Sequence, residues 1–90
     1  MTTPPSIDID KIRTSDYHEN AERTGVTDVH EPCQMCGRPV KYGGAVVRVG
    51  RYGRTLVPFD AVIPWAEDLG YFSIGPECLK KLPPEFVQKP

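Results

Sequence analysis

The chain has 90 residues, with 11 lysines and arginines against 12 aspartates and glutamates, which gives a net charge of -1. This length excludes a multidomain enzyme, a doubly wound nucleotide-binding fold and a barrel, and the charge argues against a globally basic nucleic-acid binder. Ten prolines and eight glycines predict short elements joined by turns. A core of this size usually needs disulfides, a metal or oligomerisation to be stable.

The segment 1–25 is polar and weakly patterned, and it is predicted to be a flexible acidic arm, with at most a helical turn near 16–23. Ile7, Ile9 and Ile12 are its only large aliphatic residues. The chain starts without the basic and apolar stretches of a secretory signal, and no apolar run approaches the ~18 residues that span a bilayer. We therefore expect a cytoplasmic protein with no membrane partner.

The segment 26–84 is predicted to be the folded domain, and 85–90 a C-terminal tail. A knuckle at 33–39 comes first, followed by a β-hairpin of 45–49 and 54–58 around the loop 50–53. After a connection at 60–70, with one helical turn at 64–69, we expect a short strand at 71–74. A helix of about two turns then starts near Pro76 and ends before Pro83.

Strand alternation and helical spacing predict which apolar side chains form the core. The expected members are Val46, Val49, Leu56, Phe59, Val62, Trp65, Phe72, Ile74, Leu79 and Leu82.

Three cysteines, Cys33, Cys36 and Cys78, carry the strongest signal in the sequence. An odd number of cysteines without a signal peptide is unsuited to a disulfide framework, whereas the Cys-x2-Cys spacing lets a tight turn aim two thiolates at one point. A cysteine in the first turn of a helix has its thiolate favoured by the helix dipole. We therefore predict that the three thiolates bind one Zn²⁺; the alternative is three buried or free thiols.

Structural zinc usually takes four ligands, so one is missing from this set. His30, separated from Cys33 by two residues, is the leading candidate because thiolate-rich sites favour nitrogen over carboxylate. His18, Asp60, Glu77 and water are the alternatives. The position three residues after Cys78, where a second helix ligand is usual, holds Lys81.

Two short motifs, Cys33-x2-Cys36-Gly37-Arg38-Pro39 and Gly75-Pro76-x-Cys78 after Tyr71-Phe72-x-Ile74, carry a family resemblance. Residues 30–84 resemble small treble-clef zinc fingers of the Cys-x2-Cys-Gly-Arg-Pro … Gly-Pro-x-Cys type, seen in phage and bacterial proteins of unknown function. The resemblance implies a small α+β, zinc-stabilised, treble-clef-like finger with a knuckle, a β-hairpin and a short C-terminal helix. It implies no particular task.

The stretch 32–59 holds five bases and no acid, which makes nucleic acid the first partner hypothesis. Guanidinium groups contact phosphates and tyrosine rings stack on unpaired bases. The alternative is a protein-interaction adaptor, for example a phage-type factor acting on a host protein. These arginines can also pair with the acidic flanks. The expected nucleic-acid contacts are Arg38, Lys41, Arg48, Arg51, Tyr52 and Arg54.

Enzyme activity and a small-molecule substrate are not expected. A zinc ion with four protein ligands has no open position for substrate. Cys78 as a nucleophile would need a histidine beside it, and the chain offers only His18 and His30.

Overall fold

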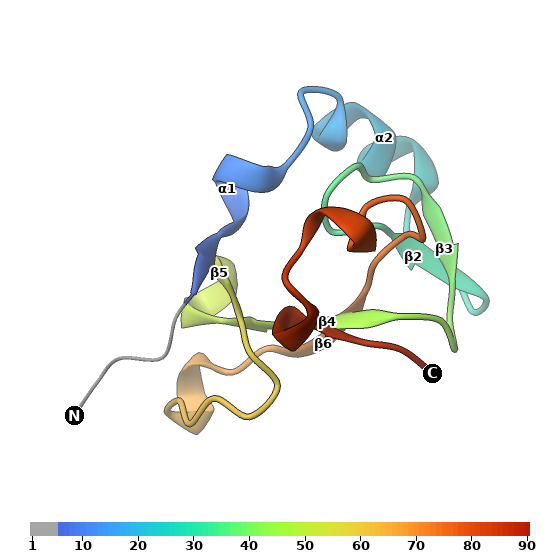
Figure 1. Ribbon diagram of the computed structural model, residues 1–90. Helices are drawn as coiled ribbons and strands as arrows, with labels where there is room; N and C mark the ends of the chain where they lie inside the picture. Colours follow the sequence, from blue (N-terminus) through green and yellow to red (C-terminus); the bar gives the residue numbers. More distant parts are fainter. Residues whose placement is uncertain (1–5) are drawn as a thin grey trace.

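The computed structural model describes residues 6–90. The protein is a small α+β domain with two antiparallel sheets and short helices (Figure 1), which confirms the predicted fold class at this level. β4 (Val46–Gly50) lies at the centre of the larger sheet. Among the described residues, no helix is both long enough and apolar enough to cross a membrane.

The predicted β-hairpin is confirmed. β4 pairs with β5 (Thr55–Val57) in antiparallel register, with Val49 opposite Leu56. The loop between them contains the 3₁₀ turn η1 (Arg51–Gly53), in which Arg51 and Tyr52 have φ values of 51° and 59°. Side chains other than glycine avoid this left-handed region at a cost of roughly 1–2 kcal/mol each, so the loop is strained.

The C-terminal residues take part in the sheet. β6 (Gly70–Ser73) covers one edge of β4, while β7 (Val87–Gln88) pairs with the first half of β4 on the edge that β5 also uses. Phe86, at the end of the 3₁₀ turn η4 (Pro84–Phe86), is buried in the core. This differs from the tail predicted at 85–90, because the Phe86 side chain gains burial that an extended tail would lack.

The N-terminal segment is packed against the domain. β1 (Ile7–Asp8) pairs with β5 and leads into α1 (Ile9–Ile12), which is followed by α2 (Tyr17–Thr24). Ile9 is only 2 % exposed and belongs to the main core. The structure thus differs from the flexible arm predicted for 1–25 wherever it describes that segment, because its isoleucines complete the core; residues 1–5 lie outside the described residues.

The second sheet surrounds the knuckle. β2 (His30–Pro32) and β3 (Pro39–Lys41) form a two-stranded antiparallel hairpin. This hairpin is joined to the outer edge of β6, where the Gln34 amide donates to the Ser73 carbonyl at 3.2 Å and the Ser73 amide donates to Glu31 Oε1 at 2.7 Å. The knuckle is therefore held at one edge of the main sheet.

The predicted C-terminal helix is reduced to one turn. The 3₁₀ turn η3 (Leu79–Lys81) follows Cys78, and the Leu79 amide donates to the Gly75 carbonyl at 3.0 Å. The backbone becomes extended at Leu82, before two prolines that cannot supply helical amide donors. The other predicted turn forms as η2 (Trp65–Glu67).

The core lies between the main sheet, the knuckle and the turns that follow Cys78. Alternation along β4 buries Val47 and Val49. The predicted core instead contained Val46 and Val49, whose side chains lie on opposite faces of the strand. Val62 and Trp65 were also expected inside, but they are 90 % and 88 % exposed on the loop between β5 and β6. The observed core consists of Ile9, Cys33, Met35, Ala45, Val47, Val49, Leu56, Ile74, Cys78, Leu82 and Phe86.

Candidate metal centre

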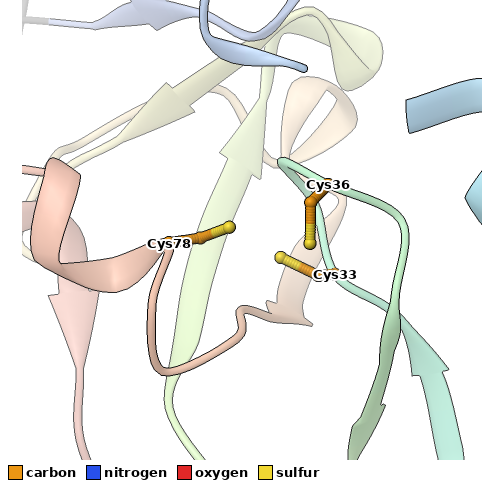
Figure 2. A group of neighbouring side chains, drawn as sticks. All are labelled: Cys33, Cys36 and Cys78. Carbon is orange, nitrogen blue, oxygen red and sulfur yellow. The ribbon is translucent and has the colours of Figure 1, made fainter. Parts of the chain in front are cut away.

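The three cysteines come together in space. Their Sγ atoms all lie within 4.8 Å of one another, and Figure 2 shows the sulfurs pointing toward one another. Cys33 and Cys36 come from the knuckle between β2 and β3, and Cys78 comes from the turn after β6. Among the described residues this is the only cluster of at least three cysteine, histidine or acidic side chains with metal-site spacing. Three cysteines in this arrangement could hold a metal ion.

Backbone hydrogen bonds close the knuckle. The Cys33 amide donates to the Arg38 carbonyl at 2.8 Å, and the Gly37 amide donates to the Cys33 carbonyl at 2.9 Å. Gly37 has a φ of 76°, a conformation that glycine adopts without steric cost. It also has no room for a side chain, since a Cβ atom there would lie 2.5 Å from the Tyr17 carbonyl oxygen. The glycine that follows the second cysteine is thus required for two reasons, its positive φ and the lack of space for a side chain.

The N-terminal segment holds the outer side of the knuckle. Four consecutive carbonyl groups, those of residues 34–37, each accept a hydrogen bond from α2 or from the link between α1 and α2. Buried carbonyls without donors are costly, so this segment fixes the knuckle's conformation. The four bonds are Arg13 Nε to Gln34 O at 3.3 Å, Thr14 N to Met35 O at 2.9 Å, Asn20 Nδ2 to Cys36 O at 2.9 Å and Thr24 Oγ1 to Gly37 O at 2.8 Å.

Amide donors favour the thiolate form of Cys33. Its Sγ accepts hydrogen bonds from Gly75 N at 3.3 Å and Met35 N at 3.5 Å. Burial alone would raise the pKa of Cys33, but amide donors, that of Cys36 foremost, outweigh burial and leave the pKa below its ordinary value. Gly75 thus links the turn before Cys78 directly to the knuckle.

Cys78 has the opposite balance. Burial, reinforced by the charge of the neighbouring Cys33 thiolate, raises the pKa of Cys78 to about 12. Three thiolates without a cation would repel one another, whereas a divalent cation at their centre reverses this effect and favours deprotonation. Without a cation Cys78 therefore stays a neutral thiol, and the cluster would carry three thiolates only with a cation bound.

His30, the predicted fourth ligand, does not join the cluster. Its ring nitrogens face other partners, with Nδ1 at 3.1 Å from Thr27 Oγ1 and Nε2 at 3.3 Å from the Thr24 carbonyl oxygen. His30 begins β2, and there its side chain tethers the end of α2. His18 packs edge-on against Tyr17 on the exposed side of α2. Neither histidine belongs to the cysteine cluster.

A pocket of about 210 Å³ includes all three cysteines in its lining. Glu77, which precedes Cys78, also lines it, but its carboxylate lies 3.7 Å from Lys80 Nζ and its side chain is largely exposed. The remaining lining residues are Arg38, Pro39, Val40, Gly75 and Pro76. No histidine lines this pocket, and no fourth ligand atom from the described residues belongs to the cysteine group.

Arg48, expected at the nucleic-acid interface, is engaged inside the protein. Its guanidinium donates to Asp68 Oδ2 at 3.0 Å, to Ala61 O at 2.7 Å and to Phe59 O at 3.2 Å. The side chain is only 13 % exposed. It fastens the loop between β5 and β6 to β4, so its guanidinium is directed into the protein, which differs from the exposed phosphate contact expected of Arg48.

The other expected nucleic-acid residues are exposed but divided between two places. Arg51, Tyr52 and Arg54 lie on the β4–β5 loop, in a hollow that also contains the carboxylates of Asp8, Asp10 and Glu67. Arg38 and Lys41 lie on the knuckle hairpin. The base-rich stretch of sequence therefore does not form one basic surface.

Comparisons with protein-family models, with curated proteins and with solved structures found no match for this chain. The residues around the cysteines that sequence reasoning missed are Asn20 and Thr24. Gly75 belongs to the motif quoted from the sequence, but its hydrogen bond to Cys33 was not predicted. Asn20 and Thr24 are four positions apart on α2 and so share one face. That pattern, two hydrogen-bonding side chains on one face of a helix, was the available signal.

Proposed function

We propose that Cys33, Cys36 and Cys78 bind one Zn²⁺ and that the protein is a zinc-stabilised, non-enzymatic binding module. The observation that carries this proposal is the grouping of three Sγ atoms within 4.8 Å of one another. Thiolates select soft or borderline metals, and zinc is the common choice for tetrahedral structural sites rich in sulfur.

The position of the cluster supports a structural role for the ion. It joins the knuckle hairpin to the turn after β6, two regions that are far apart in the sequence and that share few other polar links. Because a preformed site is absent from the unfolded chain, the metal's binding free energy contributes to folding. The zinc thereby serves the role that disulfides serve in small secreted domains.

Native mass spectrometry with a chelator titration tests the metal. We expect one zinc per chain, and circular dichroism should show structure lost as the chelator removes it. Cys36→Ser and Cys78→Ser should lose zinc and the folded 30–84 region, whereas His30→Ala should keep the zinc and serve as the matched control. Metal-free Cys78→Ser protein with native-like NMR dispersion would contradict the proposal.

We further propose that the module binds a protein partner through the loop face, defined as residues 51–54 and 61–69. The η1 and η2 turns contact each other, and Leu69 lies against Gly53. Val62 and Trp65 extend from this face into solvent. Exposed apolar side chains mark interaction sites when they lie together on a surface, and tryptophan, tyrosine and arginine dominate binding energy at interfaces.

Nucleic acid is the second candidate partner, and the pair of exposed arginines beside Tyr52 favours it. Salt dependence separates the two. Binding of a single-stranded oligonucleotide through Arg51 and Arg54 should weaken steeply between low and physiological salt and be lost in the Arg51→Ala, Arg54→Ala double variant. Binding of a protein partner should instead be lost in Trp65→Ala and change little with salt.

A further inference from the structure

We infer that the metal's fourth ligand comes from outside the chain: the fourth position opens into the pocket beside the cluster and takes an imidazole or thiolate donor, which displaces a bound water. This inference rests on the proposed function, since it concerns the same zinc site. It follows from two features of the described residues: the cysteine group has no fourth ligand, and a pocket lies beside it.

The first step is the absence of a fourth donor among the described residues. No histidine or carboxylate joins the group of three sulfurs. His30 has both ring nitrogens directed to Thr27 and Thr24. Residues 1–5, Met-Thr-Thr-Pro-Pro, contain no histidine, cysteine, aspartate or glutamate in their sequence. Tetrahedral zinc with three protein ligands keeps its fourth position for water or another exchangeable ligand.

The second step concerns Glu77, the nearest acidic alternative in the sequence. Its side chain is 84 % exposed and its carboxylate faces Lys80 Nζ at 3.7 Å. A carboxylate that bound the metal would have to leave this pair. A carboxylate oxygen is also a harder donor than the three cysteine sulfurs, which select soft or borderline metals.

The third step is access. The pocket beside the sulfurs measures about 210 Å³, several times the ~30 Å³ that a water molecule occupies in the liquid. Pro39, Val40 and Pro76 supply apolar walls, which suit the flat faces of an imidazole ring or the methylene of a cysteine. The chemistry is a ligand exchange, in which the metal–water bond breaks and a metal–nitrogen or metal–sulfur bond forms.

Cobalt substitution in the full-length protein tests the inference, because Co²⁺ reports the number and type of its ligands in its absorption spectrum. Imidazole added to the Co²⁺-loaded wild-type protein should shift the d–d bands in a saturable manner while the sulfur-to-cobalt charge-transfer band persists. Glu77→Gln should give the wild-type spectrum before imidazole and the same shift after it. The matched variant His30→Ala should behave likewise.

Two results would overturn the inference while leaving the proposed function intact. One is a cobalt spectrum that imidazole and a small thiol such as cysteine leave unchanged. The other is a spectrum that Glu77→Gln changes without any added ligand. A protein that develops no sulfur-to-cobalt band at all would overturn the proposed function itself, and this inference with it.

Size-exclusion chromatography identifies the source of the donor. Zinc-loaded protein that stays monomeric and binds imidazole places the natural donor in another molecule. The His18 side chain is exposed on α2. If zinc-dependent dimers form and the His18→Ala variant no longer forms them, the donor belongs to a second copy of this chain. Both results support an external fourth ligand.

Discussion

Asn20 on α2 donates a hydrogen bond from its side-chain Nδ2 to the carbonyl oxygen of Cys36 at 2.9 Å. One turn later, Thr24 makes the equivalent bond to the next carbonyl, that of Gly37. The helix that the sequence analysis assigned to an acidic arm thus supports the outer side of the cysteine knuckle. Its contribution can be measured separately from that of the cysteines.

Asn20→Ala should lower the free energy of unfolding by about 1–2 kcal/mol, because it leaves the Cys36 carbonyl without its donor. Urea unfolding of the zinc-loaded protein measures the loss. Glu22→Ala, an exposed change on the same helix, should alter stability by less than about 0.5 kcal/mol. Equal effects of the two variants would show that the hydrogen bond to the knuckle contributes nothing.

Gly37→Ala should be among the most damaging small substitutions in the chain. The added Cβ would lie 2.5 Å from the Tyr17 carbonyl oxygen and 2.6 Å from the Ala21 amide nitrogen, so α2 would have to move away from the knuckle. We expect a loss of roughly 3 kcal/mol, which combines backbone strain with overpacking. Thermal unfolding of the zinc-loaded variant measures it.

Gly43→Ala is the matched control for Gly37→Ala. Gly43 also has a positive φ, 93°, but a Cβ there would meet nothing within 4 Å. It should therefore show the backbone term alone, about 1–2 kcal/mol. If Gly43→Ala destabilises the protein as much as Gly37→Ala, the close approach of α2 is not the cause.

Ile9→Ala tests whether the N-terminal segment is part of the cooperative fold. Ile9 is 2 % exposed in the main core, and deletion of such a side chain costs about 2–5 kcal/mol. Val62→Ala, which shortens a side chain that is 90 % exposed, should stay within about 0.5 kcal/mol of wild type. An Ile9→Ala protein of wild-type stability would restore the prediction of an independent arm.

The pair of Arg48 and Asp68 should make stability depend on acid pH. The hydrogen bond from Arg48, followed by that from the Gly70 amide, holds the pKa of Asp68 below its ordinary value of 3.8. A lowered folded-state pKa stabilises the fold above the unfolded-state value, and this stabilisation is lost as the pH falls through 3.8 toward the folded-state pKa. Asp68→Asn should therefore lower stability at neutral pH and remove this part of the acid dependence.

The difference in unfolding free energy between wild type and Asp68→Asn measures this effect, since protonation of the cysteine ligands is common to both proteins. The difference should shrink as the pH falls below 3.8. Asp60→Asn, an exposed change on the same loop, provides the control and should give a small difference at every pH. A wild-type to Asp68→Asn difference that stays constant with pH would contradict the assigned role of the pair.

The parts of the structure that the sequence predicts correctly are those with local signals. The Cys-x2-Cys-Gly spacing specifies a knuckle, and the glycine-bounded loop 50–53 specifies the hairpin. The convergence of Cys78 with Cys33 and Cys36 was predicted from the odd number of cysteines, the Cys-x2-Cys spacing and the place of Cys78 at a helix start, and it agrees with the structure at the level of the cluster.

The differences between prediction and structure come from contacts between distant residues. Ile9 stands in a polar segment too short to show a period, so nothing local reveals that it fills the core. The sequence around Arg48 offers no acidic partner, because Asp68, which binds its guanidinium, lies twenty residues later in the chain. His30 is close to Cys33 in sequence, yet the strand that begins there turns its ring toward α2.

The position of Cys78 also has a consequence for the unfolded chain. A metal shared by Cys33 and Cys78 closes a ring of backbone from residue 33 to residue 78, and this ring contains β3, β4, β5 and β6. A cross-link over a ring of this length removes about 4 kcal/mol of conformational entropy from the unfolded ensemble in the loop-closure description. An ion that stays coordinated during denaturation would thus leave a compact, looped chain, which explores far fewer arrangements before the sheet re-forms.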